Sequence, residues 1–258
     1  MSRPLRHTID ASAGLSRDAG LLRLGLTGAM TREMFGDAEL ADGAIASQRE
    51  RDSTLATAAL RIGYAASPAL MPFVEMEAGR RFHDLKHDST GYARSADHYA
   101  LRGGVSVDFG EKLAGEFAAG WLTERPDDAR LDPISGLSVE GNLSWSPMRG
   151  ATVGLAAATA VETATAPGVT GSLLYSGNLS LRRELRANLS GELVAGIDWR
   201  DYSGGGHDLI LRGEASLTWW MNRYAGVTAR ARHEKQESSL AGRDYDATSM
   251  WLGMTLQR

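Results

Sequence analysis

Long stretches of strictly alternating apolar and polar residues constrain the fold of this chain most. From Ala187 to Trp199 one set of alternate positions reads Ala, Leu, Gly, Leu, Ala, Ile, Trp, and the other reads Asn, Ser, Glu, Val, Gly, Asp. Successive side chains of a strand point to opposite faces, so this pattern predicts a β-strand with one apolar and one polar face. An amphipathic helix would instead need apolar residues three and four positions apart, and that spacing is absent.

Similar stretches recur along the chain and predict twelve strands, most of about 11–14 residues. Strands of globular proteins usually have about 5–6 residues, whereas a tilted strand that crosses a bilayer needs about 9–11. Strand length therefore favours a membrane protein over a β-sandwich. The expected strands are about 20–30, 54–66, 72–82, 97–109, 112–124, 136–146, 150–162, 171–183, 186–200, 208–220, 223–235 and 246–258.

The connections between these strands repeat with a period of 37 residues. Four tight turns end in the basic residues Lys112, Arg149, Arg186 and Arg223, each 37 positions after the one before. Longer polar loops alternate with the short turns along the chain, at roughly 31–53, 83–97, 125–133, 163–169, 201–207 and 237–245. A repeat of two strands, one turn and one loop predicts a meander of hairpins. We expect a closed, antiparallel up-and-down transmembrane barrel with short periplasmic turns, long extracellular loops and both termini in the periplasm.

Aromatic residues of the apolar face gather near the strand ends, as two girdles at the membrane–water boundary would require. Between the girdles, the twelve steps from Ala187 to Trp199 would span roughly 28 Å at about 45° tilt, close to a hydrocarbon core. A soluble barrel with its polar face outward is the alternative, and strand length and aromatic placement argue against it. The expected girdle residues are Tyr64, Phe109, Trp145 and Trp219 near the turns, and Phe82, Tyr99, Trp121, Tyr175 and Trp199 near the loops.

Overall composition hides this pattern because it averages two faces. Apolar residues make up 43% and charged residues 23% of the 258 positions, with a net charge of −4, values that resemble an ordinary soluble protein. The mild acidity argues against nucleic-acid binding. The absence of cysteine excludes disulfides, cysteine-ligated metal centres and cysteine nucleophiles. No apolar run approaches the roughly 18–20 residues of a transmembrane helix.

The polar face is expected to line the barrel interior. Nine arginines and ten carboxylates lie on it, which leaves a net charge of −1 and no field of a single sign to select ions strongly. Arginines and carboxylates at similar depth should pair across strands, and they would then either fill the lumen or line a polar conduit. The arginines are Arg23, Arg61, Arg81, Arg102, Arg182, Arg200, Arg212, Arg230 and Arg232; the carboxylates are Glu75, Glu77, Asp108, Glu116, Glu140, Glu162, Glu192, Asp198, Glu214 and Glu234.

We single out twelve of these as pore-lining or binding residues, and we assign no catalytic residue, metal site or cofactor. His83 and His87 have a metal-like spacing but fall in an expected loop, where solvated histidines are common. No Ser/His/Asp set can be placed from the sequence alone. The twelve pore-lining residues are Arg61, Glu75, Glu77, Arg102, Glu116, Glu140, Arg182, Glu192, Arg212, Glu214, Arg230 and Arg232.

Several stretches resemble the β-barrel porin type 2 family, outer-membrane proteins found mainly in alphaproteobacteria. They are SPALMPFVEMEAGRRFHD (67–84), HYALRGGVSVDFGEKLAGEFAAGWL (98–122), ISGLSVEGNLSWSPMRGATVGLAAAT (134–159), ELRANLSGEL (184–193) and the segments MNRYAGVTARARHEK and AGRDYDATSMWLGMTLQR within 221–258. The resemblance covers most of the chain from about residue 20. It implies an outer-membrane barrel of Gram-negative bacteria, in some members encoded beside polysaccharide export genes, and it defines no catalytic motif.

The two ends of the chain depart from the family pattern. Residues 1–10, MSRPLRHTID, contain no apolar segment of a signal peptide, and family members are usually longer. Alternation over residues 3–14 indicates a weak thirteenth strand ending in a turn at 16–18, so we interpret residues 1–19 as the remnant of a further strand and 20–258 as the barrel. The last residues, Leu256, Gln257 and Arg258, include no aromatic residue of the kind that the outer-membrane assembly machinery recognises.

We therefore expect a barrel in the bacterial outer membrane that passes small polar solutes or has an accessory role in exopolysaccharide export. Its expected partners are membrane lipids, the outer-membrane assembly machinery and the solute or polysaccharide; the oligomeric state is not predicted. Two alternatives remain. One is a structural or adhesion barrel filled by arginine–carboxylate pairs, and the other is a barrel hydrolase with a serine or aspartate hydrogen-bonded to a histidine at one rim.

Overall fold

A computed structural model describes residues 5–39, 45–164 and 168–257, and these residues form one large antiparallel sheet. Within this part of the chain, no helix is long and apolar enough to span a membrane. The elements are β1 (Arg6–Ala19), β2 (Leu22–Phe35), β3 (Ala38–Glu39), β4 (Ile45–Ala46), the 3-10 helix η1 (Arg49–Arg51), β5 (Ser53–Tyr64), β6 (Leu70–His83), β7 (Ala96–Asp108), β8 (Leu113–Pro126), β9 (Ile134–Met148), β10 (Ala151–Thr163), β11 (Gly171–Arg186), β12 (Leu189–Tyr202), β13 (His207–Trp220), β14 (Ala225–Ser238) and β15 (Tyr245–Leu256).

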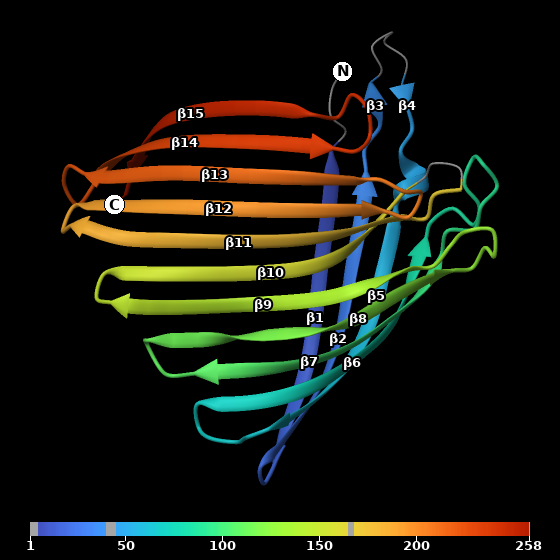
Figure 1. The fold of residues 1–258 in the computed structure, drawn as a ribbon, viewed down its shortest axis with the longest axis horizontal. Helices are drawn as coiled ribbons and strands as arrows, with labels where there is room; N and C mark the ends of the chain where they lie inside the picture. Colours follow the sequence, from blue (N-terminus) through green and yellow to red (C-terminus); the bar gives the residue numbers. More distant parts are fainter. Residues whose placement is uncertain (1–4, 40–44, 165–167, 258) are drawn as a thin grey trace.

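Thirteen strands form this sheet, and each is hydrogen-bonded to the next in chain order, from β1 and β2 through β5 to β15. β3 and β4 form a separate small hairpin in the connection between β2 and β5. Short turns (20–21, 65–69, 109–112, 149–150, 187–188 and 221–224) join the strands at one end of the sheet. The connections at the other end are mostly longer: 36–52, 84–95, 127–133, 164–170, 203–206 and 239–244. The sheet curls strongly, so that β1 and β2 lie behind the middle strands in Figure 1.

All twelve expected strands are present, with bounds that differ from the expected ones by a few residues. The weak N-terminal pattern is β1, a full strand of 14 residues, so the count of twelve is wrong by one. The turn expected at 16–18 lies instead at 20–21. There, Gly20 adopts φ 65°, which a glycine tolerates, while the β1–β2 register continues to Ala19 opposite Leu22. Residues 1–4, 40–44, 165–167 and 258, which belong to the expected N-terminal segment, two loops and the last strand, lie outside the described residues.

The expected closed barrel is not what the structure shows. β1 and β15 form the two edges of the sheet, and no hydrogen-bonded pairing between them occurs among the described residues. The odd strand count also corrects the expectation for the termini. β1 begins at the long-loop end, where Arg6 lies opposite Phe35, whereas β15 ends at the short-turn end (Figure 1). Because thirteen alternating strands make β1 and β15 run in the same direction, a ladder between them would be parallel.

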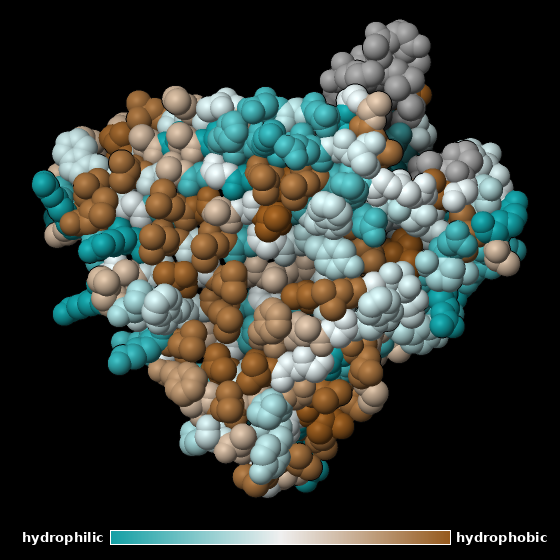
Figure 2. All heavy atoms as spheres, viewed as in Figure 1, coloured by the Kyte–Doolittle hydropathy of each residue, from teal (hydrophilic) through white to brown (hydrophobic). Residues whose placement is uncertain are grey.

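The two faces of the sheet differ in polarity. Apolar side chains such as Leu101, Leu137, Leu193 and Ile197 are exposed on the convex face. Figure 2 shows apolar side chains gathered over the middle of the strands, with polar side chains at the short turns on the left and at the loops on the right. The polar residues of the alternation occupy the concave face, because they contact residues two and three strands away, which only the inside of a curled sheet permits.

Candidate functional site: the polar concave face

One dense group of charges covers the concave face of β5 to β9. Arg61 on β5, Glu75 on β6 and Arg102 on β7 lie in register on neighbouring strands. Arg61 donates from Nε to Glu75 Oε2 at 2.7 Å, and its Nη1 reaches Glu116 Oε2 on β8 at 2.8 Å. A single guanidinium therefore ties together strands that are three positions apart in the sheet.

Arg102 lies at the centre of this group. Its side chain is only 6% exposed and its Nη1 donates to Glu75 at 3.0 Å and to Glu77 at 2.7 Å. Its Nε donates to Ser138 Oγ at 2.8 Å, and Nη2 lies 3.1 Å from Glu140 Oε1 on β9. A buried guanidinium with this many acceptors is well compensated for its loss of water. We call Arg61, Glu75, Glu77, Arg102, Glu116, Ser138 and Glu140 the β5–β9 network.

A second buried ion pair lies nearer the long loops on the same wall. Arg81 donates to Glu124 through Nε at 2.7 Å and Nη2 at 3.2 Å, and His98 Nδ1 lies 3.4 Å from the same carboxylate. His83 is also buried here, and neither of its ring nitrogens has a hydrogen-bond partner in the part of the chain that the structure describes. No cluster of three metal-ligating side chains occurs in the described residues, and His83 has no such partners to hold an ion.

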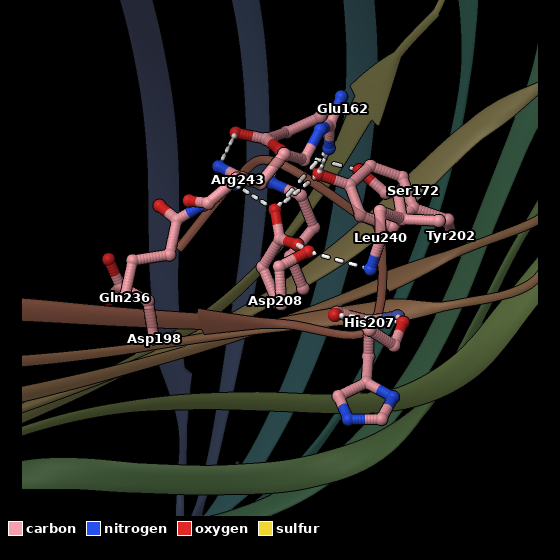
Figure 3. Close-up of polar contacts among 12 residues, drawn as sticks. Glu162, Ser172, Asp198, Tyr202, His207, Asp208, Gln236, Leu240 and Arg243 are labelled. Atoms are coloured by element: carbon pink, nitrogen blue, oxygen red, sulfur yellow. Dashed lines mark hydrogen bonds and ion pairs between the residues drawn. The ribbon is translucent and has the colours of Figure 1, made fainter. Parts of the chain in front are cut away.

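The opposite wall carries a separate group on β10 to β14 (Figure 3). Arg200 donates from Nε to Glu162 Oε2 at 2.6 Å. Asp208, which is almost fully buried, accepts from the Tyr202 hydroxyl at 2.6 Å and the Ser238 hydroxyl at 2.5 Å. Beyond these residues, Arg243 Nη1 donates to the Tyr202 oxygen at 2.6 Å, which ties the 239–244 loop to the wall.

Farther toward the short turns, the concave face is less crowded. Arg212 donates to both oxygens of Asp198, at 2.6 and 2.9 Å. Gly196 lies opposite Arg212 in the register, and a Cβ there would lie only 3.2 Å from Arg212 Nε. The glycine therefore leaves room for the guanidinium to lie across β12. Among the described residues Arg182 and Glu192, although opposite each other, are joined by no ion pair or hydrogen bond.

The twelve expected pore-lining residues thus lie on one face but do not form one site. Six belong to the β5–β9 network. The other six lie on β11 to β14, where Arg212 pairs with Asp198, Arg230 with Glu214 at 3.2 Å, and Arg232 with its near neighbour Glu234. No observation establishes that any of the twelve binds a solute, so that role stays a prediction.

The nine expected girdle residues belong to the apolar set of alternate positions. Eight of them have exposed side chains, namely Tyr64, Phe82, Tyr99, Phe109, Trp121, Trp145, Trp199 and Trp219. Tyr175 is half-buried, because it packs against a small apolar cluster of Ala100, Leu122, Ile134 and Leu173. The ring of Trp199 also stacks on His207, with centroids 4.3 Å apart.

The long loops carry their own polar anchors. In the loop 84–95 the Asp88 carboxylate accepts hydrogen bonds from Thr90 and from the Tyr92 backbone N–H at 2.9 Å, and it pairs with Arg94. Burial by itself would raise the pKa of Asp88, but these hydrogen bonds and the guanidinium outweigh burial and hold the pKa well below its usual range. The charged form of Asp88 therefore helps to order this loop.

A cavity of about 600 Å³ opens at the long-loop end, between β1, β2 and η1 on one side and β10 to β12 on the other. Sequence reasoning identified two of its charged residues, Glu162 and Arg200, as interior groups but missed Arg51 and Tyr202. Arg51 belongs to a connection with no strand periodicity, so only its place in the folded chain reveals it. Tyr202 is an aromatic residue on the polar set of β12, a break in the alternation that could have identified it.

Comparison with protein families gives a match over the whole length of the chain. A family model described as "Putative beta-barrel porin 2" matches residues 1–258. The chain belongs to this porin family. None of the curated proteins compared matches the sequence.

Four chains among the solved structures are similar to this porin-family member, and one of them is an iron transporter. It is "The FrpB iron transporter from Neisseria meningitidis (F3-3 variant)", with a TM-score of 0.49 and 8% identity. The match covers 90% of the present chain and 44% of the transporter, so the porin-family chain spans less than half of that protein's length.

The chemistry available on the concave face of this porin-family chain is that of charge pairing and hydrogen bonding. Within the described residues, no serine or aspartate is hydrogen-bonded to a histidine side chain at either rim. His98 contacts Glu124, and His233 contacts Thr248, while Asp246 lies 3.7 Å from His233 Nδ1, beyond hydrogen-bond distance. The arrangement that the hydrolase alternative requires is therefore not observed there. What the site offers is a set of fixed arginines, carboxylates and hydroxyls that can exchange hydrogen bonds with a polar solute.

Proposed function

We propose that this protein forms a β-barrel in the bacterial outer membrane and allows small polar solutes to pass through its interior. The observation that carries the proposal is the division of one curled sheet into a charged concave face and an exposed apolar convex face. Lipid favours the convex face and water favours the concave one. Membership of the porin family supports the same conclusion.

Strand length supports a membrane setting. The strands of the main sheet have 12–16 residues. At about 3.3 Å per residue and about 45° tilt, 14 residues span roughly 30 Å, the thickness of a hydrocarbon core. The exposed aromatic residues near the strand ends would then lie at the headgroups. The long loops would face outward and the short turns would face the periplasm.

A hydrocarbon environment does not tolerate unpaired strand edges, because each unpaired backbone group there costs several kcal/mol. We therefore propose that the edges of β1 and β15 pair with each other when the protein enters the membrane. The resulting ladder would be parallel, since both strands run from the long-loop end to the short-turn end. The outer-membrane assembly machinery would be the partner for insertion, and membrane lipids would surround the barrel. An accessory role in exopolysaccharide export is compatible with the same polar interior.

A second candidate function is favoured by the β5–β9 network. Its guanidiniums reach across up to three strands, as in a plug of paired charges. A barrel filled in this way would be a structural or adhesion protein with outer loops ordered by groups such as Asp88 and Arg94. The less crowded wall around Arg182 and Glu192 favours the conducting alternative.

Planar-bilayer recording of the purified, refolded protein separates the two functions. We expect discrete current steps in KCl and, for Glu192→Lys, a shift of the reversal potential toward anion selectivity in a salt gradient. Glu111→Lys, with the same change of charge on a short turn, is the matched control and should shift the potential much less. Correctly inserted protein that passes no current at any voltage would refute solute passage and leave the structural role.

A further inference from the structure

The cavity at the long-loop end contains a positioned arginine for which the described residues provide no acceptor. Arg51 lines this cavity of about 600 Å³ and is half-buried, yet no ion pair or side-chain hydrogen bond joins it to the rest of the described chain. Its guanidinium lies over the ring of Phe35, 4.1 Å from the centroid. A partly buried guanidinium without an acceptor is unusual, because arginine side chains away from water are normally paired.

The element that carries Arg51 is held firmly against the sheet. Asp52 accepts a hydrogen bond from the Phe35 backbone N–H at 2.7 Å, which joins the end of η1 to the end of β2. The backbone N–H of Asp84 donates to the Asp52 carbonyl at 3.1 Å, and Arg32 pairs with both oxygens of Asp84 at 2.5 Å. Arg51 is therefore fixed at the rim of the cavity and is not on a free segment.

Among the described residues that line the cavity, the charges leave one positive charge without a counterpart. Arg6 pairs with Glu33 on the wall formed by β1 and β2, and Arg200 pairs with Glu162 on the opposite wall. These four charges cancel, and Arg51 remains. Burial lowers the pKa of Arg51 and the nearby Arg6 lowers it further, against the opposing effect of Glu33 and Glu162. The cavity thus favours the addition of one negative charge.

The remaining polar groups of the cavity suit hydroxyl groups. Gln48, one turn before Arg51, lines the cavity, and its side-chain amide makes no hydrogen bond among the described residues. Ser172 and Tyr202 contribute hydroxyls on the opposite wall (Figure 3). The volume is that of a site for a small organic molecule, larger than a single inorganic ion requires.

We propose that this cavity binds a small organic carboxylate that carries one negative charge and several hydroxyl groups. Its carboxylate would accept a two-pronged hydrogen bond from the Arg51 guanidinium, and its hydroxyls would face Gln48 and the β10–β12 wall. Binding itself requires only the folded chain. The role of the site in capturing a solute before it enters the interior rests on the proposed function.

The test is calorimetric titration of the full chain in detergent micelles at constant ionic strength, with sodium gluconate as the probe. Sorbitol, a neutral polyol of the same chain length, and inorganic phosphate are the comparison ligands. We expect gluconate to bind with a Kd of about 1 mM, and sorbitol and phosphate to bind at least about tenfold more weakly. Arg51→Gln should weaken gluconate binding by at least about tenfold, and Arg51→Lys, which keeps the charge but loses the fork, by less.

Arg49→Gln is the matched control, because Arg49 is exposed, lies in the same 3-10 helix and does not line the cavity. It should bind gluconate like the unmodified protein. The proposal is overturned if gluconate fails to bind, if Arg51→Gln binds it as well as the unmodified chain does, or if phosphate binds equally tightly. Circular dichroism of each variant verifies folding. A protein that conducts without binding gluconate refutes only this site, whereas one that binds gluconate without conducting refutes only solute passage.

Discussion

Replacing Arg102 with methionine tests whether the β5–β9 network holds the concave face together. Methionine fills much of the same space but removes the guanidinium that pairs with Glu77, and it leaves Glu75 with Arg61 as its only arginine partner among the described residues. Removing one partner of a buried charge pair costs about 3–5 kcal/mol, since the other charge stays buried and uncompensated. The Glu140 side chain is 47% exposed and should add little, about 0–1 kcal/mol. We therefore expect Arg102→Met to lower the free energy of unfolding by about 3–5 kcal/mol.

Urea unfolding in lipid vesicles, followed by tryptophan fluorescence, measures this loss. The matched control is Arg230→Met, because the Arg230 side chain is 51% exposed and its pair with Glu214 is 3.2 Å long. That variant should lose only about 0–1 kcal/mol. Equal losses for the two variants, or a loss below about 1 kcal/mol for Arg102→Met, would show that the network is not a buried, stabilising unit.

Three further outcomes are expected. Leu193→Arg places a charge on the exposed convex face and should lower the free energy of unfolding in vesicles by about 2–4 kcal/mol. The control Leu193→Ala should lower the free energy of unfolding by less. Equal losses of unfolding free energy in the two variants would contradict lipid exposure of this position. The pKa of Asp88 is depressed in the folded loop, so the stabilisation of the loop by Asp88 is present above the usual carboxyl pKa and is lost as the pH falls through the folded value. At neutral pH, limited proteolysis should therefore cleave the loop 84–95 faster in Asp88→Asn than in the unmodified protein. An unchanged rate of cleavage would refute the anchoring role of Asp88. If β1 and β15 pair in membranes, a cysteine at position 12 (Ser12→Cys) should form a disulfide within one chain with a cysteine placed at one of the positions 247–253 on β15. Cross-links that form only between chains would exclude closure of the barrel by β1 and β15.

The strands and their order could be predicted because alternation is a local property of the sequence. In β12, for example, the residues from Leu189 to Trp199 specify by themselves which face is apolar. The 37-residue spacing of the turns then places neighbouring strands side by side. The sequence predicts β1 only weakly, because its apolar face contains few large residues, among them Ile9 and Leu15.

Contacts between distant strands could not be predicted in the same way. Arg61 reaches Glu116 three strands away because the sheet curls, and curvature depends on the whole structure. The same holds for the cavity of Arg51, which joins a connection after β2 to the wall of β10 to β12. Closure was expected from the general rule that lipid forbids open edges. That rule describes the inserted state and does not specify the register with which β1 and β15 would meet.

Cysteine labelling along β12 measures the division of the two faces most directly, because the chain has no native cysteine. Single cysteines at positions 190–197 would be treated in intact vesicles with a water-soluble, membrane-impermeant thiol reagent. A water-filled interior predicts strong labelling at the concave positions 190, 192, 194 and 196 and protection at the convex positions 191, 193, 195 and 197. Labelling without this alternation, or with the two sets reversed, would contradict a barrel whose charged face encloses water and whose apolar face meets lipid.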